Sequence, residues 1–303
     1  TNSGMLDGQY TAKFWCEDTS NNVNNTEQVT FEIKVTSTYP QISFTEPPTP
    51  ANDTSTTNRS IEINVSITEE SLSEMKFNWD DINYTIYNDS LVVMYNFDEY
   101  TRLNDTSKYG NNGTLSGATF TSSGKYGGAY VFDAVGDYVD IPTLIETLQT
   151  FTYSAWIYPE SFQDYSATII GKKEYYASAY SMFPTSLELN GLANRIACFV
   201  DSGNDYSGDL TVVYFYDFAN VWSHVACSYN GTNLSIYVNG NIVNSSLGTV
   251  TLSNPTNINY RVGESFEYGG GAGASGFNGT IDEVRIWNRS LSASEVNQMY
   301  LSL

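Results

Sequence analysis

The sequence of 303 residues predicts an all-β fold, with one large jelly-roll sandwich and a smaller β-sandwich. Three observations support this prediction. Aromatic residues make up 15% of the chain and 24 residues are tyrosine, which is typical of strands rather than of helix bundles. Apolar and polar residues alternate over short segments, as in strands with one buried face. Turn residues separate these segments about every eight to twelve positions, the spacing of sandwiches and barrels.

Residues 1–38 are predicted to form two strands joined by an Asn-rich turn. Apolar side chains recur with period two before and after that turn, at Tyr10, Ala12, Phe14 and Cys16 and again at Val29, Phe31, Ile33 and Val35. Cys16 is therefore expected on the inward face, as a buried apolar thiol. Two strands alone do not bury a core, so this pair requires partner strands.

Residues 39–90 are predicted to supply another half of a sandwich. A strand at 40–44 is followed by a Pro- and Thr-rich stretch at 45–50, which lacks periodicity and is typical of an extended connector. Alternating strands are then predicted at 61–67, 75–79 and 84–87. These strands again provide only part of a closed sheet.

Short strands follow one another closely from residue 91 onward, as expected for a jelly roll. The predicted strands are 92–97, 114–120, 129–132, 138–141, 151–158, 168–171, 187–189, 194–200, 210–216, 222–229, 234–238, 259–262 and 280–287. Only residues 292–300 are predicted to be helical, because Ser292 is a good N-cap and Glu295 follows three positions later.

Residues 91–303 resemble the laminin-G-like, concanavalin A-like jelly-roll superfamily. The motifs that carry the resemblance stand in the expected order: MYNFD at 94–98, NDTSKYGNNGT at 104–114, YVFD at 130–133, DYVDIP at 137–142, FTYSAWI at 151–157, WSHVA at 222–226, IYVNG at 236–240 and FNGTIDEVRIWN at 277–288. One such motif is weak evidence, whereas the whole series in this order is specific.

The flanking segments resemble the immunoglobulin-like β-sandwich repeats of archaeal and bacterial cell-surface proteins. The match is less specific and covers about 90 residues. It implies that 1–38 are the closing strands of one sandwich, that 39–90 are the opening strands of another, and that the jelly roll occupies 91–303. A sandwich divided in this way must be completed by a neighbouring copy or repeat.

The charge balance excludes two classes of partner. The chain has 34 acidic and 13 basic residues and a formal net charge of −21. Phosphate contacts need clustered Lys and Arg, so neither nucleic acid nor an anionic membrane surface is an expected partner. The sequence also contains no apolar run long enough to span a bilayer.

N-glycosylation sequons are unusually frequent. There are 13 of them, against roughly six expected from composition: Asn24, Asn52, Asn58, Asn64, Asn83, Asn88, Asn104, Asn112, Asn230, Asn233, Asn244, Asn278 and Asn288. This frequency predicts a glycosylated extracellular protein of a cell surface. The alternative is a chance excess in an Asn-rich chain.

The sequence predicts that the protein is not an enzyme. Glucanases of the resembled superfamily carry a Glu-x-Asp-x-Glu run on one strand, since hydrolysis needs two carboxyls facing one cleft, and this chain has no such run. His224 is the only histidine, and it is predicted to be a packed, hydrogen-bonded structural residue rather than a catalytic base. One histidine and three cysteines also exclude histidine-rich or thiolate zinc sites.

Calcium is the expected cofactor. A hard cation takes several oxygen ligands from carboxylates, amides and carbonyls. The resemblance implies that the loop containing Asp105, Asn111 and Asn112 meets Asp282 at such a site. A glycan on Asn112 would compete with that role.

Two alternatives to this calcium site remain open. Asp98 and Asp133 are possible ligands in place of the loop. In the other alternative no metal binds, the loop side chains stabilise turns, and Asp282 pairs with Arg285.

Five tyrosines lie in polar, Gly-containing segments and are candidates to stack on sugar rings. They are Tyr175, Tyr176, Tyr180, Tyr206 and Tyr268. The alternative is that they are ordinary exposed tyrosines of a Tyr-rich β protein.

Cys198 and Cys227 lie in core-like strands and are predicted to form a disulfide if those strands are neighbours.

Two functions are consistent with these features. The leading prediction is a non-enzymatic subunit of an extracellular filament or surface layer, which self-associates head to tail through its divided sandwich. The alternative is a calcium-dependent, carbohydrate-binding adhesin with the jelly roll as its lectin domain.

Overall fold

The structure is a computed structural model that describes most of the chain. The described residues are 8–13, 16–24, 26–33, 41–46, 49–57, 63–68, 74–79, 82–100, 103–141, 148–161, 166–176, 182–190, 195–202, 210–252, 259–264, 266–268 and 276–301. They form two compact units, Thr1–Ser71 and Leu72–Leu303.

The first unit consists of two-stranded sheets. Its strands are β1 (Gly8–Lys13), β2 (Cys16–Glu17), β3 (Val23–Asn24), β4 (Gln28–Ile33), β5 (Gln41–Thr45) and β6 (Asn64–Thr68). They pair as β1–β4, β2–β3 and β5–β6. No described strand closes these pairs into a sandwich, and the requirement for partner strands stays a prediction.

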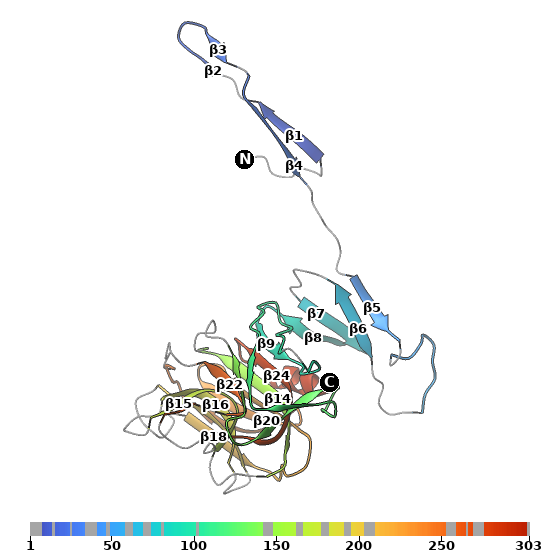
Figure 1. The fold of residues 1–303 in the computed structure, drawn as a ribbon, viewed down its shortest axis with the longest axis vertical. Helices are drawn as coiled ribbons and strands as arrows, with labels where there is room; N and C mark the ends of the chain where they lie inside the picture. The colour runs from blue at the N-terminus through green and yellow to red at the C-terminus, as the bar shows by residue number, and fades with distance from the viewer. Residues whose placement is uncertain are drawn as a thin grey trace. The chain divides into compact units, whose positions relative to one another are not determined.

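The second unit contains two large sheets, whose strands make up one body in Figure 1. Its strands are β7 (Glu74–Trp79), β8 (Ile82–Asn88), β9 (Leu91–Tyr95), β10 (Thr114–Ser116), β11 (Thr119–Thr121), β12 (Ala129–Asp133), β13 (Tyr138–Ile141), β14 (Phe151–Pro159), β15 (Ser166–Tyr176), β16 (Met182–Asn190), β17 (Arg195–Val200), β18 (Leu210–Phe215), β19 (Ser223–Tyr229), β20 (Asn233–Val238), β21 (Asn241–Leu247), β22 (Tyr260–Val262), β23 (Phe266–Tyr268) and β24 (Asn278–Trp287). The predicted all-β jelly roll is confirmed.

The two sheets are named here after their central strands. The β15 sheet has the order β10-β13-β22-β15-β16-β17-β18, with β23 paired to β15. The β14 sheet has the order β11-β12-β24-β14-β19-β20-β21, with β9 paired to β24. Neighbours that are distant in sequence, such as β13 and β22, are typical of a jelly roll.

The core is formed by side chains from both sheets, and the aromatic residues are prominent in it. Tyr95, Tyr130, Tyr153, Tyr229 and Tyr260 are each at most 1% exposed. They pack with alternating aliphatic residues of the strands, including Ile170, Leu187, Ile196, Val225, Ile236 and Ile281. This explains why a chain so rich in tyrosine builds a buried interior.

The predicted C-terminal helix is confirmed as α1 (Ala293–Leu301). Its capping box is formed as expected: the Ser292 N–H donates to Glu295 Oε2 (2.8 Å) and the Glu295 N–H donates to Ser292 Oγ (3.3 Å). The helix buries Val296 and Met299 in a second cluster with Leu91 and other residues of the β14 sheet.

The domain boundary differs from the sequence prediction. The hairpin β7–β8 was assigned to the sandwich segment 39–90, but it belongs to the same unit as the jelly roll. Met75 of β7 packs against the cluster that contains Leu91, Trp287 and Leu291. This contact between residues far apart in sequence is not visible in the local pattern.

The segment predicted as one strand at 114–120 forms two, β10 and β11, in opposite sheets. The chain changes sheets at Gly117, whose φ is +72° and whose position has no room for a side chain beside Asp137. Two further strands, β21 and β23, were not predicted. The sequence of β21 is polar because it is an exposed edge strand, so it lacks the apolar alternation of a buried strand. The Asn239-Gly240 pair before it is nevertheless a strong hairpin signal, from which this strand could have been predicted.

Cys16 is exposed, so the prediction of a buried apolar thiol is wrong. The cause is general in the first unit, where apolar side chains on the strands remain accessible. Val29 is 52% exposed, Ile42 is 62% exposed and Phe44 is 67% exposed. Period two correctly predicted the strands, but burial also requires a second layer.

Candidate functional site

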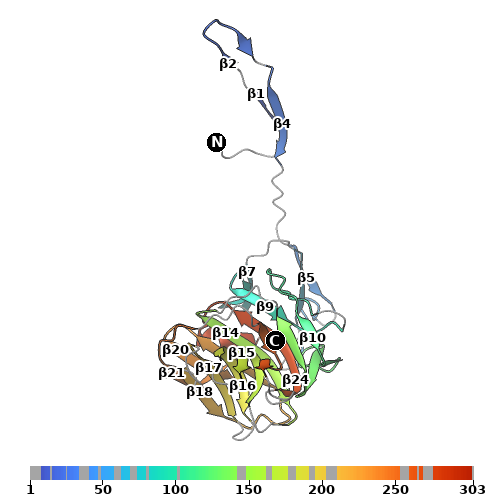
Figure 2. The same ribbon diagram turned by 60° about the vertical axis from the view of Figure 1, so that its left-hand side comes forward.

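The outer face of the β15 sheet carries a band of polar side chains on three adjacent strands. Leu187 and Leu189 of β16 belong to the core, so Ser186 and Glu188 face away from it. Thr168 of β15 is the register partner of Glu188, and strands β15 to β17 lie side by side in Figure 2.

These polar side chains are buried although they face away from the core. Thr168 and Ser186 are 0% exposed and Glu188 is 2% exposed. Neither Thr168 Oγ1 nor Ser186 Oγ has a hydrogen-bond partner in the structure. Leaving a buried hydroxyl unsatisfied costs about 1–3 kcal/mol, and such groups are accounted for by an unseen water, ion or ligand.

The same face becomes accessible toward β18. Arg195 of β17 is half-buried, and its Nε has no partner. Its register partner is Phe215, which is 63% exposed. Phe199, four positions further along β17 and on the same face, is also half-buried. The outer face therefore combines hydroxyls, a guanidinium group and aromatic rings.

The backbone brings together three of the predicted sugar-stacking tyrosines. Tyr175 and Tyr176 end β15, and β23 runs parallel to β15 with Tyr268 opposite Tyr176. Tyr180 and Tyr206 lie outside the described residues. The tyrosines that are placed thus extend the sheet that carries the polar band.

The outer positions of β16 offer one carboxylate. They are Ser186, Glu188 and Asn190. Hydrolysis of a glycosidic bond requires two carboxyl groups across the scissile bond. The described part of β16 therefore carries one carboxylate, that of Glu188, on its outer face.

Three of the four predicted calcium ligands lie together in one loop. Asp105 Oδ1 accepts hydrogen bonds from the Met94 and Ser107 N–H groups (2.8 and 2.9 Å). Asp105 Oδ2 accepts from Ser107 Oγ and the Asn111 N–H (both 2.7 Å). Asn112 Oδ1 accepts from the Asp105 N–H (2.9 Å).

The fourth predicted ligand, Asp282, holds a different loop. Its Oδ2 accepts from the Tyr126 N–H (3.0 Å) and its Oδ1 from the Glu283 N–H (2.7 Å). Asp98 secures the same glycine-containing loop by accepting from the Gly128 N–H (2.9 Å).

The side-chain oxygen atoms of Asp105, Asn112 and Asp282 thus already accept hydrogen bonds from protein donors. No cluster of three or more His, Cys, Asp or Glu side chains suited to a metal occurs among the described residues. These residues do not fit a calcium ion as they stand, and calcium binding stays a prediction. Arg285 pairs with Glu283 (2.7 Å) and not with Asp282.

Burial dominates the electrostatics of this second loop. It raises the pKa of Asp282 to about 7, an effect that the hydrogen bond from the Tyr126 N–H partly offsets. Burial likewise raises the pKa of Glu283, while the neighbouring Arg285 opposes the shift. A substantial fraction of Asp282 is therefore protonated near neutral pH.

His224 is buried, as predicted, with 1% exposure. Its ring packs against Trp156 and Tyr300, with centroids 5.5 and 6.1 Å away. The prediction of a hydrogen-bonded ring is not met, because neither ring nitrogen has a partner. Burial and the nearby Arg285 lower the pKa of His224 to about 3, which keeps the ring neutral.

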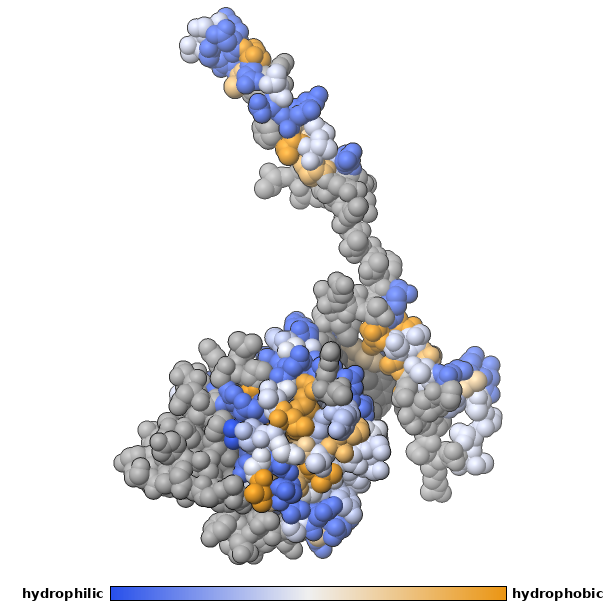
Figure 3. Space-filling model, in the orientation of Figure 1, coloured by the Kyte–Doolittle hydropathy of each residue, from blue (hydrophilic) through white to orange (hydrophobic). Residues whose placement is uncertain are grey.

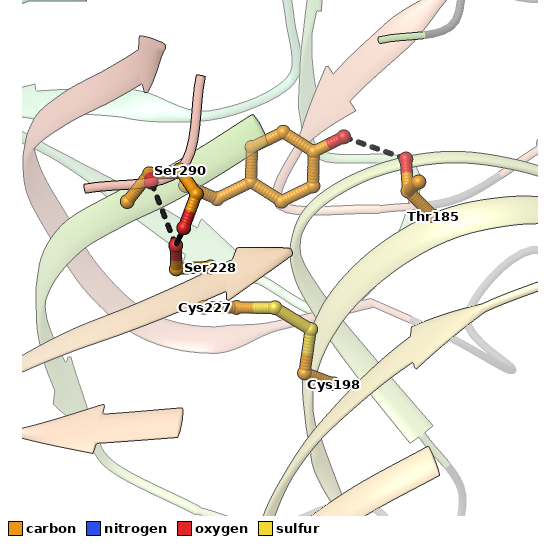
Figure 4. The surroundings of a disulfide bond; sticks show 7 residues. Thr185, Cys198, Cys227, Ser228 and Ser290 are labelled. Carbon is orange, nitrogen blue, oxygen red and sulfur yellow. Dashed lines mark hydrogen bonds between the residues drawn. A yellow bond between two sulfur atoms is a disulfide. The ribbon is translucent and has the colours of Figure 1, made fainter. Parts of the chain in front are cut away.

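Cys198 and Cys227 form a disulfide that joins the two sheets (Figure 4). The predicted geometry was that of neighbouring strands, whereas β17 and β19 belong to opposite sheets and the bond crosses the core. The two Cα atoms are 6.1 Å apart. Nearby, Tyr153 and Thr185 share a buried hydrogen bond (2.6 Å) between their hydroxyls, which also connects the sheets.

The sequon side chains differ in how their amides are held. In Asn24 and Asn230 the Oδ1 atom accepts from the hydroxyl of the threonine two positions later (2.9 and 3.1 Å). In Asn104, Asn233 and Asn244 the Nδ2 atom donates to the protein. Asn58 lies outside the described residues, while Asn52, Asn112, Asn278 and Asn288 are at least partly exposed. The side chains of Asn64, Asn83 and Asn88 are outside what the structure describes.

The two large sheets define a β-sandwich of the jelly-roll type. A laminin-G model described as the concanavalin A-like lectin/glucanases superfamily matches residues 133–297, which is more than half of the chain. The protein therefore belongs to this superfamily. The model does not reach residues 1–90, so the immunoglobulin-like resemblance there stays a prediction.

Solved structures of this fold come from carbohydrate-related proteins and toxins. Domain 4 of AbnA, a GH43 extracellular arabinanase from Geobacillus stearothermophilus in complex with arabinotriose, is 19% identical (TM-score 0.50, 70% of this chain, 98% of that one). The Trypanosoma rangeli sialidase in complex with sialic acid is 15% identical (TM-score 0.56, 77% and 36%). The botulinum neurotoxin type G receptor binding domain is 18% identical (TM-score 0.51, 70% and 51%). At these identities the likeness concerns the fold alone.

This chain spans about a third of the sialidase and half of the neurotoxin domain. The search of curated proteins gave no match. Among the described residues, no helix has the length and apolar character needed to cross a membrane.

The polar band of Thr168, Ser186, Glu188 and Arg195 was not predicted from the sequence. A signal was present in β16, where Ser186 and Glu188 alternate with Leu187 and Leu189. Such alternation normally indicates a solvated outer face. Only the structure shows that this outer face is buried and partly unsatisfied.

Proposed function

We propose that the protein is a non-enzymatic extracellular protein whose jelly roll binds a carbohydrate on the outer face of the β15 sheet. The observation that carries this proposal is the pair of buried, unpaired hydroxyls of Thr168 and Ser186 beside Glu188. Sugar hydroxyls both donate and accept hydrogen bonds, so one oligosaccharide satisfies such groups at once.

Other features of the face support a carbohydrate rather than a different polar ligand. Phe215 offers an exposed ring for the apolar face of a sugar. Arg195 contributes charged donors at the same end of the sheet. The single carboxylate on the outer face of β16 favours binding without cleavage. Because Thr168 and Ser186 are buried, binding requires that this face become accessible to the ligand.

A glycan array probed with the whole chain tests this proposal. We expect binding to a small set of related oligosaccharides, with no cleavage of those ligands on prolonged incubation. Repeating the array with a chelator tests the predicted calcium dependence. Absence of binding to any glycan on a diverse array contradicts the proposal.

A second function is favoured by the first unit, whose described strands present two apolar faces with exposed side chains. On β5–β6, Ile42 lies opposite Ile67 and Phe44 lies opposite Val65, and Phe44 is 67% exposed. The orange side chains on the N-terminal strands in Figure 3 show such apolar groups at the surface.

The pair β1–β4 presents a comparable face. Tyr10 stacks on Phe31 with ring centroids 6.1 Å apart, and Ala12 lies opposite Val29. Two-stranded sheets are marginal alone, and their free edges pair readily with other strands. We infer that β1–β4 of one copy covers β5–β6 of a second copy, which leads to head-to-tail assembly in a filament or surface layer.

Sedimentation velocity over a range of concentrations tests this assembly. The unmodified chain is expected to form oligomers as concentration rises, and Phe44→Asp is expected to reduce them strongly. Leu247→Asp is the matched control, because Leu247 is an exposed leucine (82%) on edge strand β21 of the jelly roll. A chain that stays monomeric at every concentration contradicts the inference.

A further inference from the structure

A hollow of about 480 Å³ lies beside the loop at 103–113 and edge strand β10 of the β15 sheet, and it is separate from the polar band on β15, β16 and β17. Tyr100 and Leu115 line it and are 73% and 38% exposed. Asn104, Asn112 and Thr114 supply amides and a hydroxyl around these apolar groups. An aromatic ring with nearby amide and hydroxyl groups suits a sugar ring, which has an apolar face and a polar edge.

Two asparagines beside the hollow, Asn104 and Asn112, are the first residues of sequons. Their side-chain amides make opposite kinds of hydrogen bond. The exposed Asn112 accepts from the Asp105 N–H through Oδ1 (2.9 Å), and its Nδ2 donates to no atom in the described part of the chain. Asn104 instead donates its Nδ2 to Glu99 Oε2 (3.1 Å). The fixed amide of Asn112 thus offers its nitrogen for modification.

We propose that Asn112 carries an N-linked glycan whose first sugar lies in this hollow against the ring of Tyr100. In the coupling, Asn112 Nδ2 forms a bond to the anomeric carbon of a sugar carried on a diphosphate. The bond from that carbon to the diphosphate oxygen breaks, the diphosphate leaves, and the nitrogen loses one proton to a base. The attached sugar covers Tyr100 and Leu115, which are otherwise accessible.

The occupancy of the sequons is the first test. The chain is secreted from a host that adds N-glycans, and its peptides are analysed by mass spectrometry. We expect Asn112 to be modified, and to be modified more completely than Asn104. Thr114→Val removes the sequon but keeps a β-branched residue in β10. An unmodified Asn112 overturns the proposal.

The position of the sugar is tested by melting temperatures. Enzymatic trimming to the first sugar is expected to leave the melting temperature unchanged, whereas Thr114→Val lowers it by about 2–4 °C. In a Tyr100→Ala background, Thr114→Val is expected to have no further effect. Equal shifts in both backgrounds show that the sugar does not lie on Tyr100 and overturn the proposal.

A further experiment tests whether the hollow holds the chain's own glycan or a free carbohydrate. The Thr114→Val protein is melted with millimolar free oligosaccharides. Our proposal expects no shift that depends on Tyr100, because only the attached sugar is concentrated at the hollow. A Tyr100-dependent shift with free sugar assigns the hollow to an external ligand and contradicts an intramolecular role.

Discussion

At the scale of single residues, the jelly roll contains several buried polar groups that lack a hydrogen-bond partner. Thr168, Ser186, Trp156 and both ring nitrogens of His224 fall in this class. By contrast, Asp105 is fully satisfied by four protein donors. The carboxylate of Asp105 is best explained by a role in stability. The unsatisfied hydroxyls of Thr168 and Ser186 are best explained by a ligand that binds them.

Asp105→Asn tests the structural role of this carboxylate. Replacing one acceptor oxygen by an NH₂ group loses the bonds to Ser107 Oγ and the Asn111 N–H, so we expect the free energy of unfolding to fall by about 2–3 kcal/mol. Urea denaturation measures it. If Asp105 acts through hydrogen bonds, a calcium chelator leaves the unmodified chain equally stable. A chelator effect as large as that of the substitution contradicts this account.

His224 makes the jelly roll sensitive to acid. Its pKa is lowered to about 3 in the folded state, so the unfolded chain binds the proton more tightly and stability falls as pH drops below about 6.5. His224→Phe removes this proton and keeps an aromatic ring beside Trp156 and Tyr300. Between pH 7 and pH 4.5, we expect the free energy of unfolding of the variant to fall by about 2–3 kcal/mol less than that of the unmodified chain. An unchanged pH dependence would show that His224 does not titrate on unfolding.

Asp282 has the opposite effect on how the free energy of unfolding depends on pH. Its folded-state pKa is raised to about 7, so its contribution to stability is complete below the unfolded pKa near 4 and is lost as pH rises toward 7. The two groups therefore have opposing effects between about pH 4 and 6.5. A comparison of variants is more informative than the pH profile of the unmodified chain alone.

At the scale of elements, the disulfide and the Tyr153–Thr185 hydrogen bond fasten the two sheets across the core. The cysteines are 29 positions apart in sequence. Closing a loop of this length in the unfolded chain stabilises the folded state by about 3–4 kcal/mol in the chain-entropy model.

Replacing both Cys198 and Cys227 by Ala is thus expected to lower the free energy of unfolding by at least that amount, measured by guanidinium denaturation. Cys16→Ser is the control and should have no effect, because Cys16 is exposed and free. A double variant as stable as the control would show that the bond does not form.

The sequence predicted most jelly-roll strands because period-two alternation is local. It did not predict the sheet change at Gly117, since the clash with Asp137 that requires glycine there involves residues twenty positions apart. The prediction that Cys16 is buried was wrong for a related reason, because no second layer of described residues covers its strand and Cys16 is exposed. The polar band of Thr168 and Ser186 was missed because burial of an outer sheet face depends on the whole fold.

At the scale of the whole molecule, two proposed functions reside in separate units. The jelly roll supplies a polar, partly aromatic sheet face for a carbohydrate, and the first unit supplies uncovered apolar strands for a second copy. Assembly would bring many copies of the jelly roll together, and such multivalency strengthens weak carbohydrate binding without new contacts.

The central claim is that the outer face of the β15 sheet binds a carbohydrate, and isothermal titration calorimetry with site variants tests it most directly. The ligand is the best oligosaccharide from the array, and the variants are Thr168→Val and Ser186→Ala, with Thr119→Val as control because Thr119 is an exposed threonine of strand β11. Removing an unsatisfied buried hydroxyl should maintain or raise stability. We predict that each site variant nevertheless binds about tenfold more weakly, while the control binds like the unmodified chain. Unchanged affinity in both site variants would contradict the claim.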